Sequence, residues 1–238
     1  MNLIILEQSD FVAPDRVRLR GRRQQHIREV HRATPGDRLR VGLLNGDIGH
    51  GEITAQNGDF IELKVDLHRP PPDALPLTLI LALPRPKMLK RVIEHATALG
   101  VKNLYLINAY RVEKSYWQTP WLHENKLREL CLLGLEQAVD TRMPQVHLRK
   151  RFKPFVEDEL PGIAADSLKL VAHPVAERPC PVDIAEPATL VVGPEGGFIP
   201  YEVDKLRENG FEAVHLGPRI LRVETALPVL LGRIFPGR

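Results

Sequence analysis

Two glycine-proline turns carry the residues of this sequence whose types and spacing could do chemistry. The first turn, residues 193–197, reads Gly-Pro-Glu-Gly-Gly, and the second, residues 217–219, is followed closely by Arg222, Glu224 and Thr225. A glycine-rich turn presents backbone N–H groups to a ligand without bulky side chains in the way. Arginine beside a carboxylate can stabilise developing negative charge and handle a proton. The turns therefore predict a ligand cleft built largely from backbone, with a charged cluster beside it.

The first turn fits neither of the common glycine-rich nucleotide loops. A phosphate-binding loop needs a lysine and a hydroxyl after its last glycine, and the dinucleotide fingerprint needs Gly-x-Gly-x-x-Gly. The sequence GPEGGF, residues 193–198, supplies neither pattern. The nine histidines and two cysteines show no metal-ligand spacing, and no Gly-x-Ser-x-Gly or Cys-His arrangement is evident. We therefore expect neither a metal site nor a hydrolase.

Strand-like and helix-like segments alternate throughout the part of the chain that contains both turns. Continuous apolar runs predict buried strands, and apolar residues at helical spacing follow them. This alternation predicts an α/β domain with a mainly parallel sheet, in which two turns at the ends of neighbouring strands would wall one cleft. The predicted strands are 77–83, 102–107, 168–172, 190–192 and 213–216, and the predicted helices are 89–99, 122–138, 201–208 and 223–234.

The amino-terminal part has a different pattern, which predicts a small and mostly β module, barrel-like in form. The Asn-Gly-Asp sequences at 45–47 and 57–59 carry hairpin turn chemistry. Three consecutive prolines within residues 69–76 predict a semi-rigid linker, so we place two domains at 1–72 and 73–238. The predicted strands are 3–6, 17–19, 38–44, 48–53 and 60–65, with one helical piece at 23–32.

Charge is unevenly distributed along the chain. The formal net charge of all 238 residues is +3, yet residues 16–40 hold nine arginines against Glu29 and Asp37, a local net of +7. Such a concentration suits a polyanion, although a solvated basic face is the alternative interpretation. Two cysteines, no signal peptide and no apolar run long enough for a membrane span make a cytoplasmic location the default expectation.

The sequence GPEGGF, followed some twenty residues later by LGPRILRVETA at 216–226, resembles the carboxy-terminal signature of the RsmE family. These enzymes are SPOUT-class methyltransferases that methylate N3 of a uracil in 16S ribosomal RNA of the small ribosomal subunit. The resemblance implies an α/β SPOUT domain with a deep trefoil knot that binds S-adenosyl-L-methionine. It also implies a homodimer, because SPOUT sites are usually completed by a partner subunit.

Further segments carry the resemblance over nearly the whole chain. Residues 26–37 resemble the family's H-I-x-x-V-L-R-x-x-x-G-D segment, which implies an amino-terminal PUA-like β-barrel that binds RNA. Residues 95–101 resemble K-A-T-E-L-G-V, and residues 136–144 resemble an E-Q-x-x-R-x-x-x-P region. Ala98 replaces a usual glutamate, while Val139 and Asp140 stand where the family has a small residue and an arginine. The role of that arginine would pass to Arg142 or be lost.

The resemblance and the residue chemistry together assign three groups of candidate site residues. Methyl transfer to uracil N3 requires a bound cofactor, an unpaired base and stabilisation of the anion that develops on the base. We expect Arg222 to stabilise that anion, and Glu224 or Glu195 to accept a proton or to orient Arg222; the alternative is that either carboxylate only caps a helix or holds the knot together. The expected cofactor residues are His173, Val192, Gly193, Pro194, Gly196, Gly197, Leu216, Gly217, Ile220, Leu221, Thr225 and Ala226; the expected RNA-binding residues are Arg22, Arg23, His26, Arg28, Arg32 and Arg142.

The sequence leaves alternatives open at three points. Within residues 26–32, Ile27 and Val30 are expected to point inward, which leaves Arg28 and Arg32 outside, either to contact phosphates or simply as surface arginines on a short helix. The segment 110–121 mixes cations with aromatic residues and would either stack on RNA or pack at a subunit contact. The alternatives to the expected methyltransferase are a non-catalytic RNA-binding or ribosome-assembly protein on the same fold, and a methyltransferase with a shifted RNA target.

Overall fold

The computed structural model describes residues 2–237, which divide into two compact units. The first unit comprises residues 2–73 together with Leu132–Met143, and the second comprises Ala74–Cys131 together with residues 144–237. The first unit thus takes in the last turns of helix α3 (Glu124–Ala138) and the loop that follows it.

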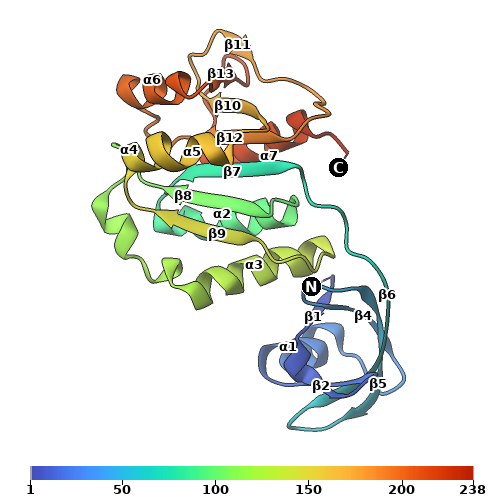
Figure 1. Ribbon diagram of the computed structural model, residues 1–238. Coiled ribbons are helices and arrows are strands. Elements are labelled where there is room, and N and C mark those ends of the chain that lie inside the picture. The colour runs from blue at the N-terminus through green and yellow to red at the C-terminus, as the bar shows by residue number, and fades with distance from the viewer. Residues whose placement is uncertain (1, 238) are drawn as a thin grey trace. The chain divides into compact units, whose positions relative to one another are not determined.

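The first unit is built on one curled, six-stranded sheet in the order β1-β4-β5-β6-β3-β2 (Figure 1). Strands β1 and β4 are parallel, whereas the other pairs are antiparallel. The two Asn-Gly-Asp turns join β4 to β5 and β5 to β6, which confirms the hairpin predictions. The strands are β1 (Ile4–Leu6), β2 (Phe11–Ala13), β3 (Arg16–Leu19), β4 (Arg38–Leu43), β5 (Ile48–Gln56) and β6 (Ile61–Arg69).

A short helix between β3 and β4 covers one side of the first unit's core. Helix α1 (Gly21–His26) continues into a π-helical segment, η2 (Ile27–His31), which closes with a bond from the Arg32 N–H to the Ile27 carbonyl five residues earlier. A π-helical turn contains more residues than an α-helical turn, so the chain rotates less per residue about the helix axis. Ile27 is fully buried, but Val30 is 64% exposed. The expectation that both side chains point inward is therefore wrong for Val30.

The second unit contains a seven-stranded, entirely parallel sheet in the order β11-β13-β10-β12-β7-β8-β9. The predicted α/β class is confirmed, but the two strands that lead into the glycine-proline turns are not neighbours, because β10 lies between β12 and β13. The strands are β7 (Leu77–Ala82), β8 (Asn103–Ile107), β9 (Gln145–Arg149), β10 (Leu168–Ala172), β11 (Arg178–Pro179), β12 (Ala188–Val192) and β13 (Glu212–His215).

Helices cover the sheet of the second unit. Helices α2 (Pro86–Ala98) and α7 (Val223–Ile234) pack against each other and lie behind the sheet in the view of Figure 1. Helix α6 (Pro200–Glu208) connects β12 to β13. An unpredicted helical stretch follows β9 as α4 (Phe152–Pro154), η5 (Phe155–Glu159) and α5 (Leu160–Ile163). Across residues 2–237, no helix is both long enough and apolar enough to cross a membrane.

Candidate functional site

A pocket of about 250 Å³ opens at the carboxyl ends of β10, β12 and β13. Carboxyl ends of parallel strands meet at one edge of a sheet, where ligands bind in α/β folds. The loops after these three strands provide the walls, and helix α7 closes one side. The lining residues are Ala172, His173, Pro174, Val192, Gly193, Pro194, Glu195, Gly196, Gly197, Phe198, Val214, His215, Leu216, Gly217, Arg219, Ile220, Leu221, Val223, Ala226 and Leu230.

The loop after β12 turns tightly enough to need its glycines. A Cβ added at Gly193 would lie 3.1 Å from Cδ2 of the Phe198 ring, so the backbone and this buried ring approach closely. Gly197 has a φ of +73°, and its N–H donates to the Pro194 carbonyl over 2.7 Å. The loop is thus fixed by its own sequence.

The loop after β13 is held by a histidine that sequence reasoning did not single out. Gly217 has a φ of +112°, and its N–H donates to Nδ1 of His215 over 2.9 Å. This bond leaves the other ring nitrogen of His215 as the available donor in the neutral side chain. Ile220 lines the pocket mouth with 81% of its surface exposed, whereas Leu221 is partly buried. An apolar side chain this exposed at a mouth is available to pack on a ligand.

The third wall follows strand β10, which lies between β12 and β13. The His173 N–H donates to the Val214 carbonyl over 2.9 Å, which joins this loop to β13. Burial, and secondarily the charge of Arg207, lowers the pKa of His173, so its neutral form is favoured at pH 7. His173 is one of the residues expected to bind the cofactor, and its loop follows β10, which lies between β12 and β13.

Most of the expected cofactor residues come together around this one pocket. All of them except Thr225 are among its lining residues, although they come from three loops and a helix. Of the expected catalytic residues, Glu195 lines the pocket, whereas Arg222 and Glu224 do not. Sequence reasoning missed Val223 and Leu230, which share one face of α7 with Ala226 through spacings of three and four residues. That helical spacing could have identified them.

Arg222 and Glu195 both have exposed side chains, but only Glu195 lines the pocket. Arg222 is the N-cap residue of α7, where its carbonyl accepts from the N–H of Thr225 at 2.9 Å, and its side chain is exposed. It stands between two lining residues, Leu221 and Val223. Glu195 is also exposed, and its Oε1 accepts from the Arg85 N–H at 3.1 Å, next to the end of β7. Both charged groups are thus accessible to a large substrate.

Two of the expected RNA-binding arginines hold the first unit together. The Arg23 guanidinium donates to both carboxylate oxygens of Asp10, at 2.5 and 2.7 Å, and to the Ile5 carbonyl. Arg22 forms a two-pronged pair with Glu136, at 2.6 and 3.0 Å. Asp10 and Glu136 are both buried, and buried carboxylates need such partners. These pairs give Arg22 and Arg23 a structural task.

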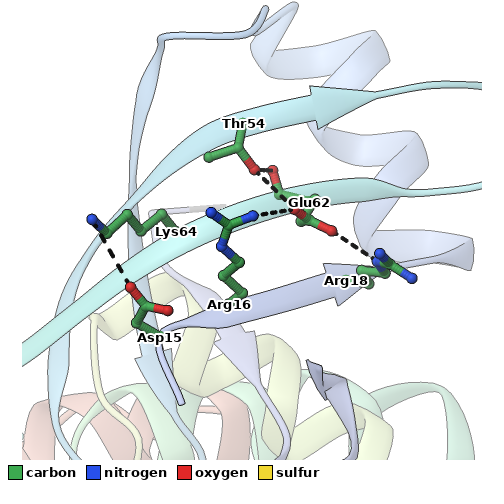
Figure 2. A network of polar contacts seen from close by, with 6 residues as sticks. All are labelled: Asp15, Arg16, Arg18, Thr54, Glu62 and Lys64. Carbon is green, nitrogen blue, oxygen red and sulfur yellow. Dashed lines mark hydrogen bonds and ion pairs between the residues drawn. The ribbon is translucent and has the colours of Figure 1, made fainter. Parts of the chain in front are cut away.

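A further carboxylate pairs with two arginines on the outer face of the sheet (Figure 2). Glu62 accepts from Nε of Arg18 at 2.8 Å, from Arg16 at 3.4 Å and from the Thr54 hydroxyl at 3.3 Å. The Arg18 hydrogen bond is the main cause that lowers the pKa of Glu62. The Arg18 guanidinium also lies 5.0 Å from the centre of the Phe60 ring. Four of the nine arginines counted in residues 16–40 are thus paired with carboxylates.

Arg28, in η2, and Arg32, which follows it, are exposed cations without a carboxylate partner among the residues that the structure describes. Neither forms an ion pair with any residue in the range 2–237, and both side chains face solvent. His26 is half-buried, burial is the first cause of its lowered pKa, and its Nε2 has no hydrogen-bond partner within that range. Its ring meets His31 edge to face at 5.0 Å. Arg28 and Arg32 therefore remain available for phosphate contacts.

The loop at 139–143, where the sequence departs from the family, is hydrogen-bonded to the β4–β5 turn within the first unit. The Thr141 carbonyl accepts from the Asn45 N–H at 2.7 Å, and the Asn45 side chain accepts from the Met143 N–H at 2.8 Å. Val139 has a φ of +58°, a left-handed conformation that costs a β-branched residue. Asp140 is buried, and its Oδ1 accepts from the Arg142 N–H at 2.9 Å. Asp140 therefore has a structural role, because its carboxylate holds the backbone of this loop.

Comparison with known proteins assigns this chain to a family. The RNA methyltransferase domain family matches residues 71–235. The ribosomal RNA small subunit methyltransferase E of Mycobacterium bovis is 30% identical over 216 residues, which is 88% of this chain and 82% of that protein. The same-named protein of Treponema pallidum is 28% identical over 236 residues, or 95% and 87%. The chain therefore belongs to the RsmE family of RNA methyltransferases.

A solved structure shows the same fold over nearly the whole chain. It is a ribosomal RNA small subunit methyltransferase E from Neisseria gonorrhoeae bound to S-adenosyl methionine. The TM-score is 0.74 and the identity 21%, with 98% of this chain and 95% of that chain covered.

Among residues 2–237, no group of three or more histidine, cysteine, aspartate or glutamate side chains could hold a metal ion.

Proposed function

We propose that this protein methylates N3 of a uracil in 16S ribosomal RNA of the small subunit, with S-adenosyl-L-methionine as the methyl donor. The observation that carries the proposal is the pocket at the ends of β10, β12 and β13, which gathers the residues of both glycine-proline motifs. Its support is the membership in the RsmE family and the relatives named as small-subunit ribosomal RNA methyltransferases.

The pocket residues fit the proposed cofactor. Val192, Leu216 and Leu221 provide apolar walls for an adenine ring, while the turns at Gly193 and Gly217 offer backbone groups to its polar edge. The Neisseria gonorrhoeae structure with this fold is described as bound to S-adenosyl methionine. Bound here, the cofactor would supply an electrophilic methyl group.

The protein's own residues must orient the base and handle one proton. Uracil N3 lies on the pairing edge, so the base must be unpaired before it reaches the pocket. Arg222 is proposed to stabilise the negative charge that develops over the uracil oxygens, because its guanidinium stays charged and can form two bonds. Glu195, the one expected catalytic carboxylate on the pocket lining, is proposed to accept the N3 proton.

We extend the proposal to the finer features that the family implies. The curled sheet of the first unit is proposed to be a PUA-like barrel that binds RNA, with Arg28 and Arg32 at the phosphates. The second unit is proposed to contain the deep trefoil knot, and the packing of α7 against α2 supports a carboxy-terminal segment tucked beside the first helix of that unit. A homodimer that works on cytoplasmic ribosomal RNA completes the proposal.

Mass mapping of methylated nucleosides tests the reaction directly. The purified protein is incubated with labelled S-adenosylmethionine and unmethylated small ribosomal subunits, and the RNA is digested and analysed. The expected product is 3-methyluridine. A different methylated nucleoside would identify a shifted target, and the absence of any methylated nucleoside from a folded protein that binds RNA would contradict the proposal.

A further inference from the structure

The loop after β8 lies directly against the loop of the proposed cofactor pocket. Nη1 of Arg111 donates to the Gly196 carbonyl, and a Cβ added at Gly196 would lie 3.0 Å from Cδ of Arg111. The arginine side chain is therefore laid across the glycine, and a larger residue at this position would displace it. Arg111 thus connects the segment 110–121 to the pocket loop.

A buried carboxylate fixes the same segment from another side. Glu202, on α6, is 3% exposed, and its Oε1 accepts from the Tyr110 N–H at 2.7 Å. Its Oε2 accepts from the Ile199 N–H at 3.0 Å. One carboxylate thus joins the backbone of Tyr110 to the end of the pocket loop, with each oxygen accepting one N–H. Charge-assisted bonds of this kind hold the backbone firmly.

The Tyr110 ring differs from the other aromatic rings of its segment. It is 78% exposed, although its backbone is fixed. Trp117 is tied inward by the bond from its Nε1 to Oδ1 of Asn108 at 2.8 Å. Trp121 lies under the Lys90 ammonium, 4.1 Å from the ring centre. Among the aromatic residues of 110–121 that the structure describes, Tyr110 therefore presents the most open face.

The surroundings of Tyr110 favour RNA over a second protein subunit as its partner. Arg111, Glu113 and Lys114 beside it are charged and exposed, while Val112 is buried. The core of a subunit interface is depleted in charge and more apolar than this. A single open aromatic ring beside cations has the chemistry that stacks on an unpaired base and neutralises its phosphates.

We propose that Tyr110 is a stacking platform for an unpaired base of the RNA substrate, held beside the methyl-transfer pocket by Glu202 and Arg111. This inference rests on the proposed function and adds a substrate contact to it. Because the platform and the pocket loop share Glu202 as an anchor, a base stacked on Tyr110 is kept in register with the pocket. Arg111 and Lys114 would follow the backbone of the same RNA strand.

Three variants test the platform: Tyr110→Ala, Tyr110→Phe, and Tyr201→Ala as a control at another exposed tyrosine of the same unit. We would measure the Kd for unmethylated 16S ribosomal RNA without cofactor, kcat/KM for methyl transfer, cofactor Kd and molecular mass by light scattering. Loss of one stacked base is expected to weaken RNA binding and kcat/KM about tenfold in Tyr110→Ala. Tyr110→Phe and Tyr201→Ala should stay within about twofold of the wild type, with cofactor Kd and mass unchanged.

Two results would overturn the inference. One is a Tyr110→Ala protein that binds RNA as tightly as the wild type does, and the other is a loss of activity that accompanies a changed molecular mass, which would assign Tyr110 to a subunit contact. A wild-type protein that binds RNA but does not methylate it would contradict the proposed function alone, because the cofactor-free Kd would still measure the platform.

Discussion

Local sequence shapes the pocket at the edge of the parallel sheet, whereas contacts with distant residues determine the role of each arginine in the segment 16–40. At the pocket, residues 193–197 and 217–219 form turns through their own glycines and prolines. In the arginine-rich segment, distant carboxylates decide what each cation does: Arg18 meets Glu62 across 44 residues of sequence, and Arg22 meets Glu136 across 114. A site built from backbone turns can therefore be located from its motif, whereas a charge count overestimates the free positive surface.

The largest predicted effect is the loss of turnover when Arg222, which adjoins the pocket lining, is replaced. Arg222→Ala should lower kcat about a hundredfold or more, because the developing charge on the base loses its cation. The cofactor Kd should change by less than about tenfold, since the Arg222 side chain is not on the pocket lining. Methyl-transfer assays and calorimetry measure the two quantities. Arg222→Lys, which keeps the charge without the two-pronged geometry, should fall between, and wild-type turnover of Arg222→Ala would remove the residue from the mechanism.

The second prediction concerns the free energy of unfolding, which should depend on the arginines that are paired with buried carboxylates and not on the unpaired ones. Arg23→Ala should lower the free energy of unfolding by about 2 kcal/mol, because it leaves the buried Asp10 carboxylate without its partner. This figure lies below that for a fully buried pair, since the Arg23 side chain is 20% exposed. Urea denaturation is the measurement. Adding Asp10→Asn should recover part of the loss, and an unchanged midpoint for Arg23→Ala would contradict its structural task.

The free arginines should give the opposite pattern. Replacing Arg28 and Arg32 together by alanine should leave stability within about 0.5 kcal/mol, because both side chains are exposed. RNA affinity should fall about tenfold at physiological salt, and the slope of log K against log salt should decrease by about 1.5 to 2. Binding titrations over a salt series measure both. A slope equal to that of the wild type would return these arginines to the solvated surface.

The smallest predicted effect concerns the loop at 139–143 in the first unit. Val139→Gly should raise the free energy of unfolding by about 1 kcal/mol, because glycine adopts a φ of +58° without the steric penalty of valine. Val139→Ala is the matched control, since it loses the same packing but keeps a Cβ. Thermal denaturation of both variants measures the difference. A glycine variant no more stable than the alanine variant would contradict the predicted backbone strain, because neither variant keeps the methyl groups of the valine.

Regular apolar spacing was the most informative feature of the sequence. Helix α7 spans Val223–Ile234 and strand β10 spans Leu168–Ala172, as their patterns predict, because α7 buries apolar residues at helical spacing and β10 buries Leu170 and Val171 within a short apolar run. The helical stretch 152–163 escaped prediction, since Pro154, Pro161 and Gly162 interrupt its pattern and part of it is π-helical. Strand β9, at an edge of the sheet, has no fully buried residue and gives a correspondingly weak signal.

Relations between distant segments could not be predicted. No local pattern shows that β10 lies between β12 and β13, or that Glu202 reaches back to Tyr110 across 92 residues of sequence. The π-helical turn that exposes Val30 also depends on hydrogen bonding that spacing does not reveal. The candidate pocket was nevertheless predictable, because each of its loops is marked by its own glycine or histidine next to a proline.

A crystal structure of the protein with S-adenosyl-L-methionine tests the central claim most directly. The account predicts that the cofactor lies between the turns at 193–197 and 217–221, with His173 on a third side and the methyl group directed toward open solvent where a base can enter. Cofactor bound elsewhere, or crystals of a folded protein that take up no cofactor at saturating concentration, would contradict the assignment of this pocket.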